Sequence, residues 1–280
     1  MPATAVTQTV LRSEEIRPAI GSRVLSSKQE LLSGALANDI RELLQQRGVL
    51  VFPEVALSDD EQIEFTKTLG KFQPEPRGGD IFKVTLDASQ GSSAEYLKGS
   101  LYWHLDGTMN DVPILASILS SKKVASWGGN TGFCNTYAAW EQLPEEQKRE
   151  IDDLRVMHSV WASVFYYEPE PSLAKLKGMQ AIGERELPLV WKHRSGRKSL
   201  ILGCTAHRVL GVEPAKSAEI IVGLREWATS ERFSYSHEWK VGDLVMWDNT
   251  GTMHRAEAYD LNSGRMLHRT KLAGEESFFE

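Results

Sequence analysis

The segment GSLYWHLDGT, residues Gly99–Thr108, alternates apolar and polar side chains in the way that a β-strand does. The alternation separates two sets of residues: Leu101, Trp103 and Leu105 on one face, and Tyr102, His104 and Asp106 on the other. The polar face predicts either a strand surface in contact with water or a metal site inside a barrel. Residues two apart in a strand share a face, so His104 and Asp106 can hold one ion together. An H-x-D pair alone is a weak signal, and the remainder of the chain has to decide between the two.

Composition describes an ordinary globular chain. Of the 280 residues, 41% are hydrophobic and 25% are charged, and the net charge is −6. This length fits one large β or α/β domain or two small ones, and the patterns along the chain, described below, favour a single domain over residues 1–280. No run of Lys and Arg stands out, so we expect a small-molecule substrate and no nucleic acid as partner.

Cysteine usage and hydropathy predict where the protein works. Cys134 and Cys204 form no metal or redox motif and indicate reduced thiols of a cytoplasmic protein. The N-terminus has no signal-peptide pattern, and no apolar stretch approaches 18 residues. Both observations predict that the chain neither crosses a membrane nor uses one as a partner.

The N-terminal quarter predicts two helices. Residues 1–24 suggest a loose arm or an edge strand. Residues 26–48 predict one helix, with Ser27 and Glu30 in capping-box spacing and Gly48 at its end. Residues 49–52 follow as a short buried strand, and a second helix is predicted from Ser58 to about residue 70.

Two segments are predicted to border a site. Residues 71–99 are rich in Gly, Pro and Ser around one strand pattern, IFKVTL, and such segments are often lids. Residues 157–180 carry a dense aromatic group and suggest a second wall of the pocket, shaped for an apolar or aromatic substrate. Trp161 and Phe165 are its candidate substrate contacts. The alternative is a helix-to-strand connection that buries these aromatic rings.

Several strand patterns follow, interrupted by helical stretches near residues 137–143, 145–154 and 214–229. The strand patterns are PILASILSS, SLILGC, RFSYSHEWK, DLVMWD and RMLHRTKL. No GxGxxG or GxxxxGK[ST] motif occurs, so the signatures of Rossmann and P-loop folds are missing. The sequence therefore predicts a mainly β fold with flanking helices, a cupin-like jelly-roll barrel.

A third candidate ligand lies near the C-terminus. The strand pattern DLVMWD leads through a turn to His254, and Arg265 follows eleven residues later. Two imidazoles and one carboxylate form the 2-His-1-carboxylate set of non-haem Fe(II) oxygenases, which leaves positions on the metal open. His104, Asp106 and His254 are therefore the candidate metal ligands and catalytic residues. Arg265 suits the far carboxylate of a metal-bound 2-oxo acid, because guanidinium binds carboxylates bidentately.

At this point the chain resembles the taurine dioxygenase (TauD/TfdA) family of Fe(II)/2-oxoglutarate-dependent dioxygenases. The resemblance is carried by WHLDGT, GGNT at 128–131, SGRKSL at 195–200, WDN at 247–249, MHRA at 253–256 and the C-terminal GRMLHRTKL. It implies a double-stranded β-helix fold, with His104, Asp106 and His254 as iron ligands. It also implies that Thr131 and Arg265 hold the distal carboxylate of 2-oxoglutarate.

The activity that the resemblance implies is oxidation of an unactivated C–H bond of a small organic substrate. The cofactor and co-substrates are Fe(II), 2-oxoglutarate and O₂, and succinate and CO₂ are released. Halogenating relatives lack the metal carboxylate, so Asp106 favours hydroxylation, with desaturation as a further outcome. Because family members often form dimers or tetramers, a homodimer or homotetramer is an expectation, and the sequence leaves the oligomeric state open.

The substrate stays open between two classes. Taurine-using members carry a His in the segment matching GKFQPEP and an Asn four residues before the metal His. This chain offers Gln73 or a neighbour and Ser100 at those places, so taurine is disfavoured and an apolar or aromatic substrate is expected. Tyr102 and Ser100 share the metal side of the strand and are candidate pocket residues. Arg269 matches an arginine that lies near the substrate acid group in members with anionic substrates. It is expected either to bind substrate or to assist the co-substrate, and a carboxylate- or sulfonate-bearing substrate is the alternative.

The remaining predictions concern the other histidines and one position at which the chain differs from the family pattern. His237 belongs to an apolar stripe and His268 faces away from Arg269, so both are interpreted as structural. His207 has no chelating neighbour but is a minor candidate for substrate contact. The family's usual Arg after WDN is Thr250 here, which affects hydrogen bonding around the ligands but not the ligands themselves.

A protein of another class is the remaining alternative. A non-redox jelly-roll metal protein, either a sensor or an isomerase, would share the three metal ligands. It would have no use for the pair of Thr131 and Arg265.

Overall fold

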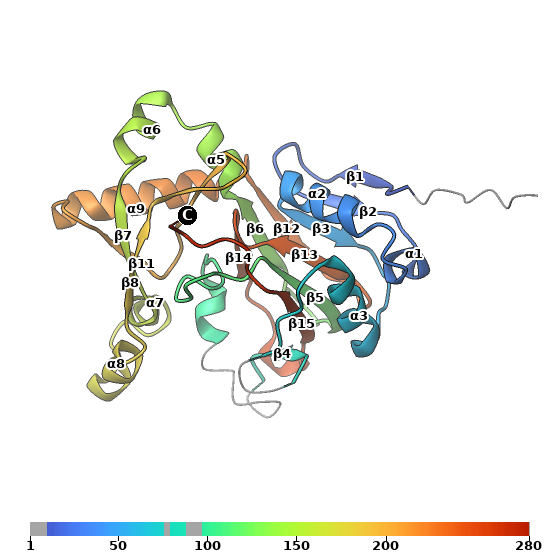
Figure 1. Ribbon diagram of the computed structural model, residues 1–280. Helices are drawn as coiled ribbons and strands as arrows, with labels where there is room; N and C mark the ends of the chain where they lie inside the picture. The colour runs from blue at the N-terminus through green and yellow to red at the C-terminus, as the bar shows by residue number, and fades with distance from the viewer. Residues whose placement is uncertain (1–9, 76–78, 88–96, 280) are drawn as a thin grey trace, which may run out of the picture.

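The computed structural model describes residues 10–75, 79–87 and 97–279, which form a mixed α/β fold with four sheets (Figure 1). The largest sheet has seven strands in the order β1-β2-β3-β13-β5-β15-β4, and only β2 and β3 are parallel. These strands are β1 Ser13–Glu15, β2 Ser22–Val24, β3 Val49–Phe52, β4 Phe82–Val84, β5 Ala116–Lys123, β13 Leu244–Asp248 and β15 Met266–Leu272.

Three smaller sheets complete the strand structure. A three-stranded sheet has the order β12-β6-β14, another has the order β11-β7-β8, and a two-stranded sheet joins β10 and β9. Their strands are β6 Thr131–Asn135, β7 Arg155–Ser159, β8 Glu184–Pro188, β9 Val190–Lys192, β10 Lys198–Leu200, β11 Ala206–Val209, β12 Ser234–His237 and β14 Thr252–Ala256.

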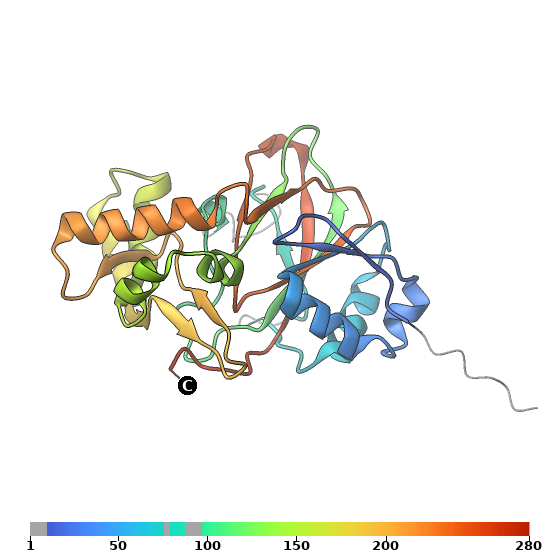
Figure 2. The ribbon, with the colours of Figure 1, turned by 90° about the horizontal axis from the view of Figure 1, so that it is seen from above.

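Helices lie on two sides of the strands. Figure 2 shows α1–α3 on one side and the helices from α5 to α9 on the other. The helices are α1 Lys28–Leu32, α2 Ala37–Arg47, α3 Asp59–Leu69, α5 Thr136–Glu141, α6 Glu145–Ile151, α7 Val160–Tyr167, α8 Leu173–Gln180 and α9 Pro214–Ala228, with short 3₁₀ turns η2 Lys98–Leu101 and η3 Leu261–Ser263. Within the described ranges, no helix is both long enough and apolar enough to cross a membrane.

The seven-stranded sheet buries both of its faces, because alternate residues of each strand point in opposite directions. On one face, Leu50 of β3 and Met246 of β13 join a buried cluster with Ile40 of α2 and Phe65 of α3. The opposite face packs against the β12-β6-β14 sheet through a second cluster. Its buried members are Ile20, Val49, Val51, Leu119, Phe133, Trp239, Val245, Trp247 and Leu267. The space between these two sheets is where the candidate ligands converge.

The helix caps are confirmed, but the prediction of one helix over residues 26–48 is wrong. Ser27 forms a capping box with Glu30, and Ser58 forms one with Glu61. The first helix ends at residue 32, and a second begins at residue 37. Gly34 has a φ of +74°, a left-handed conformation that interrupts the helical hydrogen bonds and turns the chain between α1 and α2.

The prediction of a strand over Gly99–Thr108 is also wrong. Residues 98–101 form η2, and His104 makes only an isolated antiparallel bridge with His254. On its other side this short extended stretch is bonded by Cys204, whose N–H donates to the Trp103 carbonyl at 2.8 Å. Extended structure at this point therefore depends on neighbours distant in sequence rather than on the alternation alone.

The structure describes one of the two segments predicted to border the site in part and the other in full. In segment 71–99, residues 76–78 and 88–96 lie outside the described residues, and the predicted strand IFKVTL is confirmed as β4, which pairs with β15. In segment 157–180, the aromatic residues lie on α7, where Phe165 and Tyr166 are exposed. The N-terminal segment 1–24, predicted as a loose arm or an edge strand, contributes β1 and β2 at the edge of the large sheet. Its residues 1–9 lie outside the described residues.

Candidate metal centre

Two of the predicted ligands are joined through their backbones. The N–H of His104 donates to the His254 carbonyl at 3.0 Å, and the N–H of His254 donates to the His104 carbonyl at 2.9 Å. This exchange fixes two residues that lie 150 positions apart in the sequence. Their rings stand 4.1 Å apart between centroids, so the backbone pairing delivers both imidazoles to one place.

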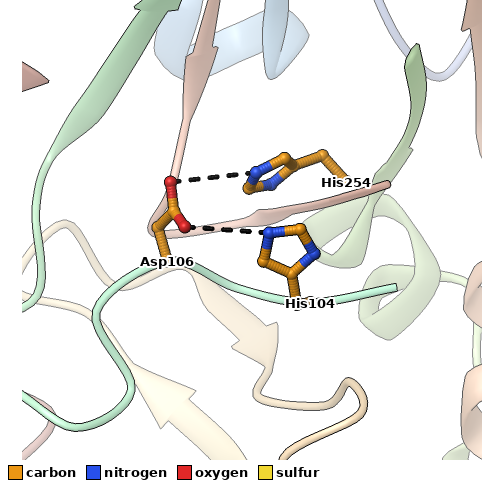
Figure 3. A group of neighbouring side chains, drawn as sticks. All are labelled: His104, Asp106 and His254. Atoms are coloured by element: carbon orange, nitrogen blue, oxygen red, sulfur yellow. Dashed lines mark ion pairs between the residues drawn. The ribbon is translucent and has the colours of Figure 1, made fainter. Parts of the chain in front are cut away.

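The third predicted ligand points between the two imidazoles (Figure 3). Asp106 Oδ1 lies 3.8 Å from Nε2 of His104, and Asp106 Oδ2 lies 3.8 Å from Nε2 of His254. One ligand atom from each residue falls within 4.8 Å of the others, and all three residues are buried or half-buried. Among the described residues, this is the one group of three or more His, Cys, Asp or Glu side chains with such spacing.

The protonation of the three residues fits a divalent cation. His104 Nδ1 donates to the carbonyl of Tyr102 at 2.8 Å, so the lone pair of this imidazole is on Nε2, which faces Asp106. Burial and the nearby His104 lower the pKa of His254 well below its usual value. Burial alone would raise the pKa of Asp106, but the neighbouring His254 and Arg269 charges lower it to about 2. The site thus offers the Nε2 lone pair of His104, a second imidazole and one carboxylate, the donor set of the 2-His-1-carboxylate centres.

A chain of hydrogen bonds orients the carboxylate. Ser117 of β5 donates its hydroxyl to Asp106 Oδ2 at 3.2 Å. Ser117 accepts from the Asn249 side-chain amide at 3.1 Å, and the Asn249 Oδ1 accepts from the Trp247 indole at 2.9 Å. The Trp247 ring also packs against His254 at 4.6 Å. The strand-to-turn segment WDN therefore supports both the carboxylate and one imidazole.

Three basic residues from one strand region face this site. Arg265 directly precedes β15, and Arg269 and Lys271 alternate along it. Gln62 of α3 donates to the carbonyl of His268 and to the Thr270 hydroxyl on the opposite side of the strand. The alternation of β15 thus turns Arg269 and Lys271 towards the site and His268 and Thr270 towards α3.

Arg269 lies beside the metal ligands. Its Nη1 is 3.7 Å from Asp106 Oδ2, its Nη2 is 3.5 Å from Glu75 Oε1, and its guanidinium stacks on Phe82 of β4 at 4.8 Å. Its Nε is buried and has no hydrogen-bond partner among the described residues. Lys271 Nζ binds the same Glu75 oxygen at 3.0 Å.

Arg265 is almost fully buried, at 3% exposure. Its Nη2 donates to the Gly129 carbonyl at 2.8 Å, its guanidinium lies over the Tyr259 ring at 4.9 Å, and burial lowers its pKa. Thr131 lies two residues beyond Gly129 and is also buried, with its hydroxyl oxygen accepting from the Trp239 indole at 2.9 Å. The two residues predicted to hold 2-oxoglutarate therefore belong to one buried region.

The side chains of the remaining predicted pocket residues make their contacts outside the three-ligand group. Tyr102 stacks against Tyr166 of α7 at 5.1 Å, and the Ser100 hydroxyl donates to the Leu97 carbonyl within η2. Trp161 donates to Glu184 and packs against His207 at 4.8 Å, and Phe165 contacts Trp161. Of these three α7 residues, Tyr166, and not Trp161 or Phe165, has a ring contact with the segment carrying His104.

The histidines interpreted as structural have partners elsewhere. His237 is buried and lies 3.2 Å from Asp243, and His268 Nδ1 lies 2.8 Å from Asp59. Both lie outside the three-residue group.

Sequence reasoning missed three polar residues that complete the site. Lys271 and Ser117 were detectable, because Lys271 has the parity of Arg269 in β15 and Ser117 lies within a predicted strand. Glu75 had no local signal, since it lies in an irregular segment and its partners are distant in sequence.

Comparison with known proteins agrees with this geometry. The family model described as "Taurine catabolism dioxygenase TauD, TfdA family" matches residues 12–271. The chain is 32% identical to an alpha-ketoglutarate-dependent 2,4-dichlorophenoxyacetate dioxygenase of Burkholderia sp. (strain RASC), over 94% of this chain and 95% of that protein. It is 30% identical to an (S)-phenoxypropionate/alpha-ketoglutarate-dioxygenase of Delftia acidovorans, over 95% and 96% of the two chains.

A solved structure gives the same result in three dimensions. The crystal structure of AAD-2 in complex with Mn(II) and N-oxalylglycine superimposes with a TM-score of 0.82 and 28% identity. The match covers 96% of this chain and 100% of that one. Sequence, fold and ligand geometry lead to one conclusion: this chain is a dioxygenase of the TauD/TfdA family.

Proposed function

We propose that this dioxygenase uses Fe(II) and 2-oxoglutarate to oxidise a C–H bond of a small organic acid with an apolar or aromatic body. His104, Asp106 and His254 hold the metal through Nε2, a carboxylate oxygen and Nε2. When bound, Fe(II) and 2-oxoglutarate supply activation of O₂ and oxidation of the C–H bond, with release of succinate and CO₂. The chain itself binds, orients and shields the reactants.

Arg265 and Thr131 bind the distal carboxylate of 2-oxoglutarate in this proposal. Arg265 is buried, which makes an ion pair with a carboxylate stronger than it would be in water. The Thr131 hydroxyl already accepts a hydrogen bond from Trp239, so its own proton is directed to another acceptor. Together they offer a planar cation and a neutral donor, which suits a carboxylate.

One observation carries the assignment of an acidic substrate. The Nε of Arg269 is buried and has no hydrogen-bond partner among the described residues, although the guanidinium is fixed by Phe82, Glu75 and Asp106. A buried donor without a partner is costly, and a substrate carboxylate satisfies it. The relatives named above act on 2,4-dichlorophenoxyacetate and phenoxypropionate, which combine an acid group with an aromatic ring.

The charges around the site support a substrate with one negative charge. A divalent metal and the Asp106 carboxylate together carry one positive charge. The 2-oxoglutarate dianion and Arg265 together carry one negative charge, so the four groups are neutral as a set. Glu75 and Lys271 form an ion pair and cancel each other. Among the charges of the described residues, Arg269 therefore remains the cation without a full counter-charge, and a monoanion balances it.

The frame of the site supports the same proposal. We infer that the seven-stranded sheet and the β12-β6-β14 sheet, packed face to face, form a double-stranded β-helix within one domain over residues 1–280. The described parts of the predicted lid segment 71–99 support its place beside the site, because β4 and Glu75 contact β15 next to Arg269. Residues 157–180 form the second wall, with Tyr102, Ser100, Trp161 and Phe165 as further substrate contacts. The oligomer is a homodimer or homotetramer.

Two measurements test the proposed function. Anaerobic addition of Fe(II) and 2-oxoglutarate should give a visible charge-transfer band, and phenoxyacetate should then stimulate succinate release in the presence of O₂. His104→Ala should lose both signals. Arg269→Met should keep the band but raise KM for phenoxyacetate by roughly 30-fold or more, since a charged hydrogen-bond pair contributes about 2 kcal/mol or more.

Other results would redirect the assignment. A protein that binds Fe(II) without the band in the presence of 2-oxoglutarate would be a non-redox metal protein, such as a sensor or isomerase. Succinate release that is stimulated by neutral aromatic compounds and unaffected by Arg269→Met would replace the acid by a neutral lipophilic substrate.

A further inference from the structure

Glu75 is a largely buried acid in an irregular segment whose backbone pairs with β15 shortly before this residue. Phe72 forms a β-bridge with Leu272, and the Gln73 N–H donates to the Lys271 carbonyl at 2.9 Å. The Glu75 N–H donates to the Gly79 carbonyl at 3.1 Å. Only 10% of the Glu75 side chain is exposed. The carboxylate is thus built into the site wall.

The Glu75 carboxylate lies close to two cations, and one of the two contacts is shorter than the other. Its Oε1 is 3.0 Å from Lys271 Nζ and 3.5 Å from Arg269 Nη2. Lys271 is 7% exposed and has the closer contact, so Glu75 chiefly neutralises this lysine. Arg269 keeps most of its charge for another partner.

Lys271 faces the site rather than the outside of the sheet. It shares a strand face with Arg269, two residues earlier, and its cross-strand neighbour on β5 is Ser117. Ser117 is the residue that donates to the Asp106 carboxylate. Directly opposed residues in an antiparallel pair lie about 5 Å apart on one face, so Lys271 lies within the wall that surrounds the ligands.

Removal of the Glu75 charge would take from Lys271, a buried cation, the one counter-ion that it has among the described residues. Such a charge is strongly unfavourable unless an anion pairs with it. A ligand held by Arg269 and carrying a second negative charge would supply that anion. With Glu75 present, the same ligand would meet a carboxylate at this place and be repelled.

We infer that Glu75 is a specificity-determining residue that restricts the substrate site to anions of a single charge by neutralising Lys271. The inference rests on the proposed function, in which Arg269 binds the acid group. It predicts that the charge of the substrate, and not only its shape, is selected at residue 75.

The test compares two acids of similar shape and different charge. Phenoxyacetate carries one negative charge, and phenoxymethylphosphonate carries close to two at a pH of about 8. Dissociation constants are measured by calorimetry on the Mn(II) form with N-oxalylglycine, which does not turn over, and kcat/KM is measured by succinate release. Glu75→Gln should raise the preference for the phosphonate over the carboxylate by roughly tenfold in both measurements.

Two further variants separate specificity from structural damage. Adding Lys271→Met to Glu75→Gln should return the preference towards the wild-type ratio, because the second cation is gone. Glu64→Gln removes an exposed charge that pairs with Lys67 on α3 and should leave the ratio unchanged.

The outcomes are distinct. An equal loss of affinity for both acids in Glu75→Gln, or an unchanged ratio, would overturn the inference and leave the proposed function intact. If the wild type binds neither acid, or if Arg269→Met binds both as the wild type does, the proposed function fails and this inference fails with it.

Discussion

The carboxylate of Asp106 is surrounded by groups that fix its direction. His104 lies next to its Oδ1 and His254 next to its Oδ2. Arg269 lies beside the carboxylate, and Ser117 donates a hydrogen bond to Oδ2. A metal ligand held in this way needs little rearrangement when the ion binds, so the supporting residues contribute to metal affinity.

Ser117→Ala tests that contribution at the level of one hydroxyl group. We expect the dissociation constant for Mn(II) to rise by about 10- to 100-fold, because the carboxylate loses a donor and Asn249 loses an acceptor. Isothermal titration of the metal-free protein with Mn(II) measures this dissociation constant.

Ser121→Ala is the matched control. Ser121 lies on the same strand, is also buried, and its hydroxyl has no hydrogen-bond partner among the described residues. Equal weakening of Mn(II) binding by the two variants would show that packing of β5, and not the bond to Asp106, determines the affinity.

Arg265→Ala should act on the co-substrate. We expect KM for 2-oxoglutarate to rise by roughly 10- to 150-fold, the loss of a charged hydrogen bond of about 1.5–3 kcal/mol, while Mn(II) affinity stays close to that of the wild type. Arg155→Ala serves as control, since Arg155 pairs with Glu186 at 3.0 Å in the β11-β7-β8 sheet. An unchanged KM in Arg265→Ala would remove Arg265 from the 2-oxoglutarate site.

Among the structural elements, the short extended segment at residues 103–105 has the greatest effect on the site. His254 bonds it on one side and Cys204 bonds it on the other. Gly203 approaches it so closely that an added Cβ would lie 2.9 Å from the His104 Cα and 3.0 Å from the Trp103 oxygen. The loop after β10 therefore packs against the segment that carries His104, on the side opposite to His254.

Gly203→Ala should displace that segment. We expect the free energy of unfolding to fall by about 1–3 kcal/mol and Mn(II) affinity to fall with it, since the φ of +116° and the close backbone contacts both oppose a side chain. Denaturant unfolding and metal titration measure the two effects. Gly211→Ala shares a positive φ, at +72°, but has open space around its Cβ position, so it should lose stability without losing metal affinity. A loss of metal affinity in Gly211→Ala as well would argue against the support by Gly203.

The end of β13 carries a second buried acid. Asp248 Oδ1 accepts hydrogen bonds from the Thr250 N–H at 2.8 Å and from the Thr250 hydroxyl at 2.5 Å. Burial raises the pKa of Asp248 from 3.8 to about 6, although these bonds act in the opposite direction. The folded protein thus keeps a proton at this place that the unfolded chain releases at a lower pH.

Asp248→Asn should therefore change the pH dependence of stability. Since the folded pKa is the higher one, the contribution of Asp248 is present below pH 3.8 and declines as the pH rises to about 6. We expect the variant to gain up to about 3 kcal/mol relative to the wild type between these values and to keep this gain at neutral pH. Denaturant unfolding of both proteins at a series of pH values checks the prediction, and parallel curves would refute it.

Local patterns in the sequence predicted much of the element structure. The caps at Ser27 and Ser58, the strands β5, β13 and β15, and the helix α9 depend on residues close in sequence, and the structure confirms them. The ligand set was also predictable, because H-x-D, His254 and Arg265 occur in characteristic spacing.

One error depends on a local backbone conformation, and the other differences depend on long-range contacts. A left-handed Gly34 divides the predicted helix, and residues 103–105 become extended only because His254 and Cys204 bond to them. Glu75 gains its role from Lys271 and Arg269, which lie almost 200 positions away. Such interactions are decided by tertiary contacts, which periodicity does not contain.

For the whole molecule, metal binding joins distant parts of the chain. The ligands come from the segment before β5 and from β14, 150 residues later, so the ion adds a link that the unfolded chain lacks. Mn(II) at a free concentration of about 100 times Kd should raise Tm by roughly 5–10 °C. Calorimetry measures the shift, and a chelator should reverse it. An equal rise in Asp106→Ala would mean that the ion stabilises the fold from another site.

The strand β15 has a geometric consequence. Arg265 and Arg269 are four residues apart, about 13 Å along an extended backbone that is paired on both sides near Arg269. If these residues anchor the co-substrate and the substrate, the strand acts as a fixed ruler between the two acid groups. A longer substrate cannot move its anchored end, so additional carbon atoms must extend away from it. The position of attack would then be counted from the acid terminus, and a homologous series of acids would be oxidised at one constant bond distance from it.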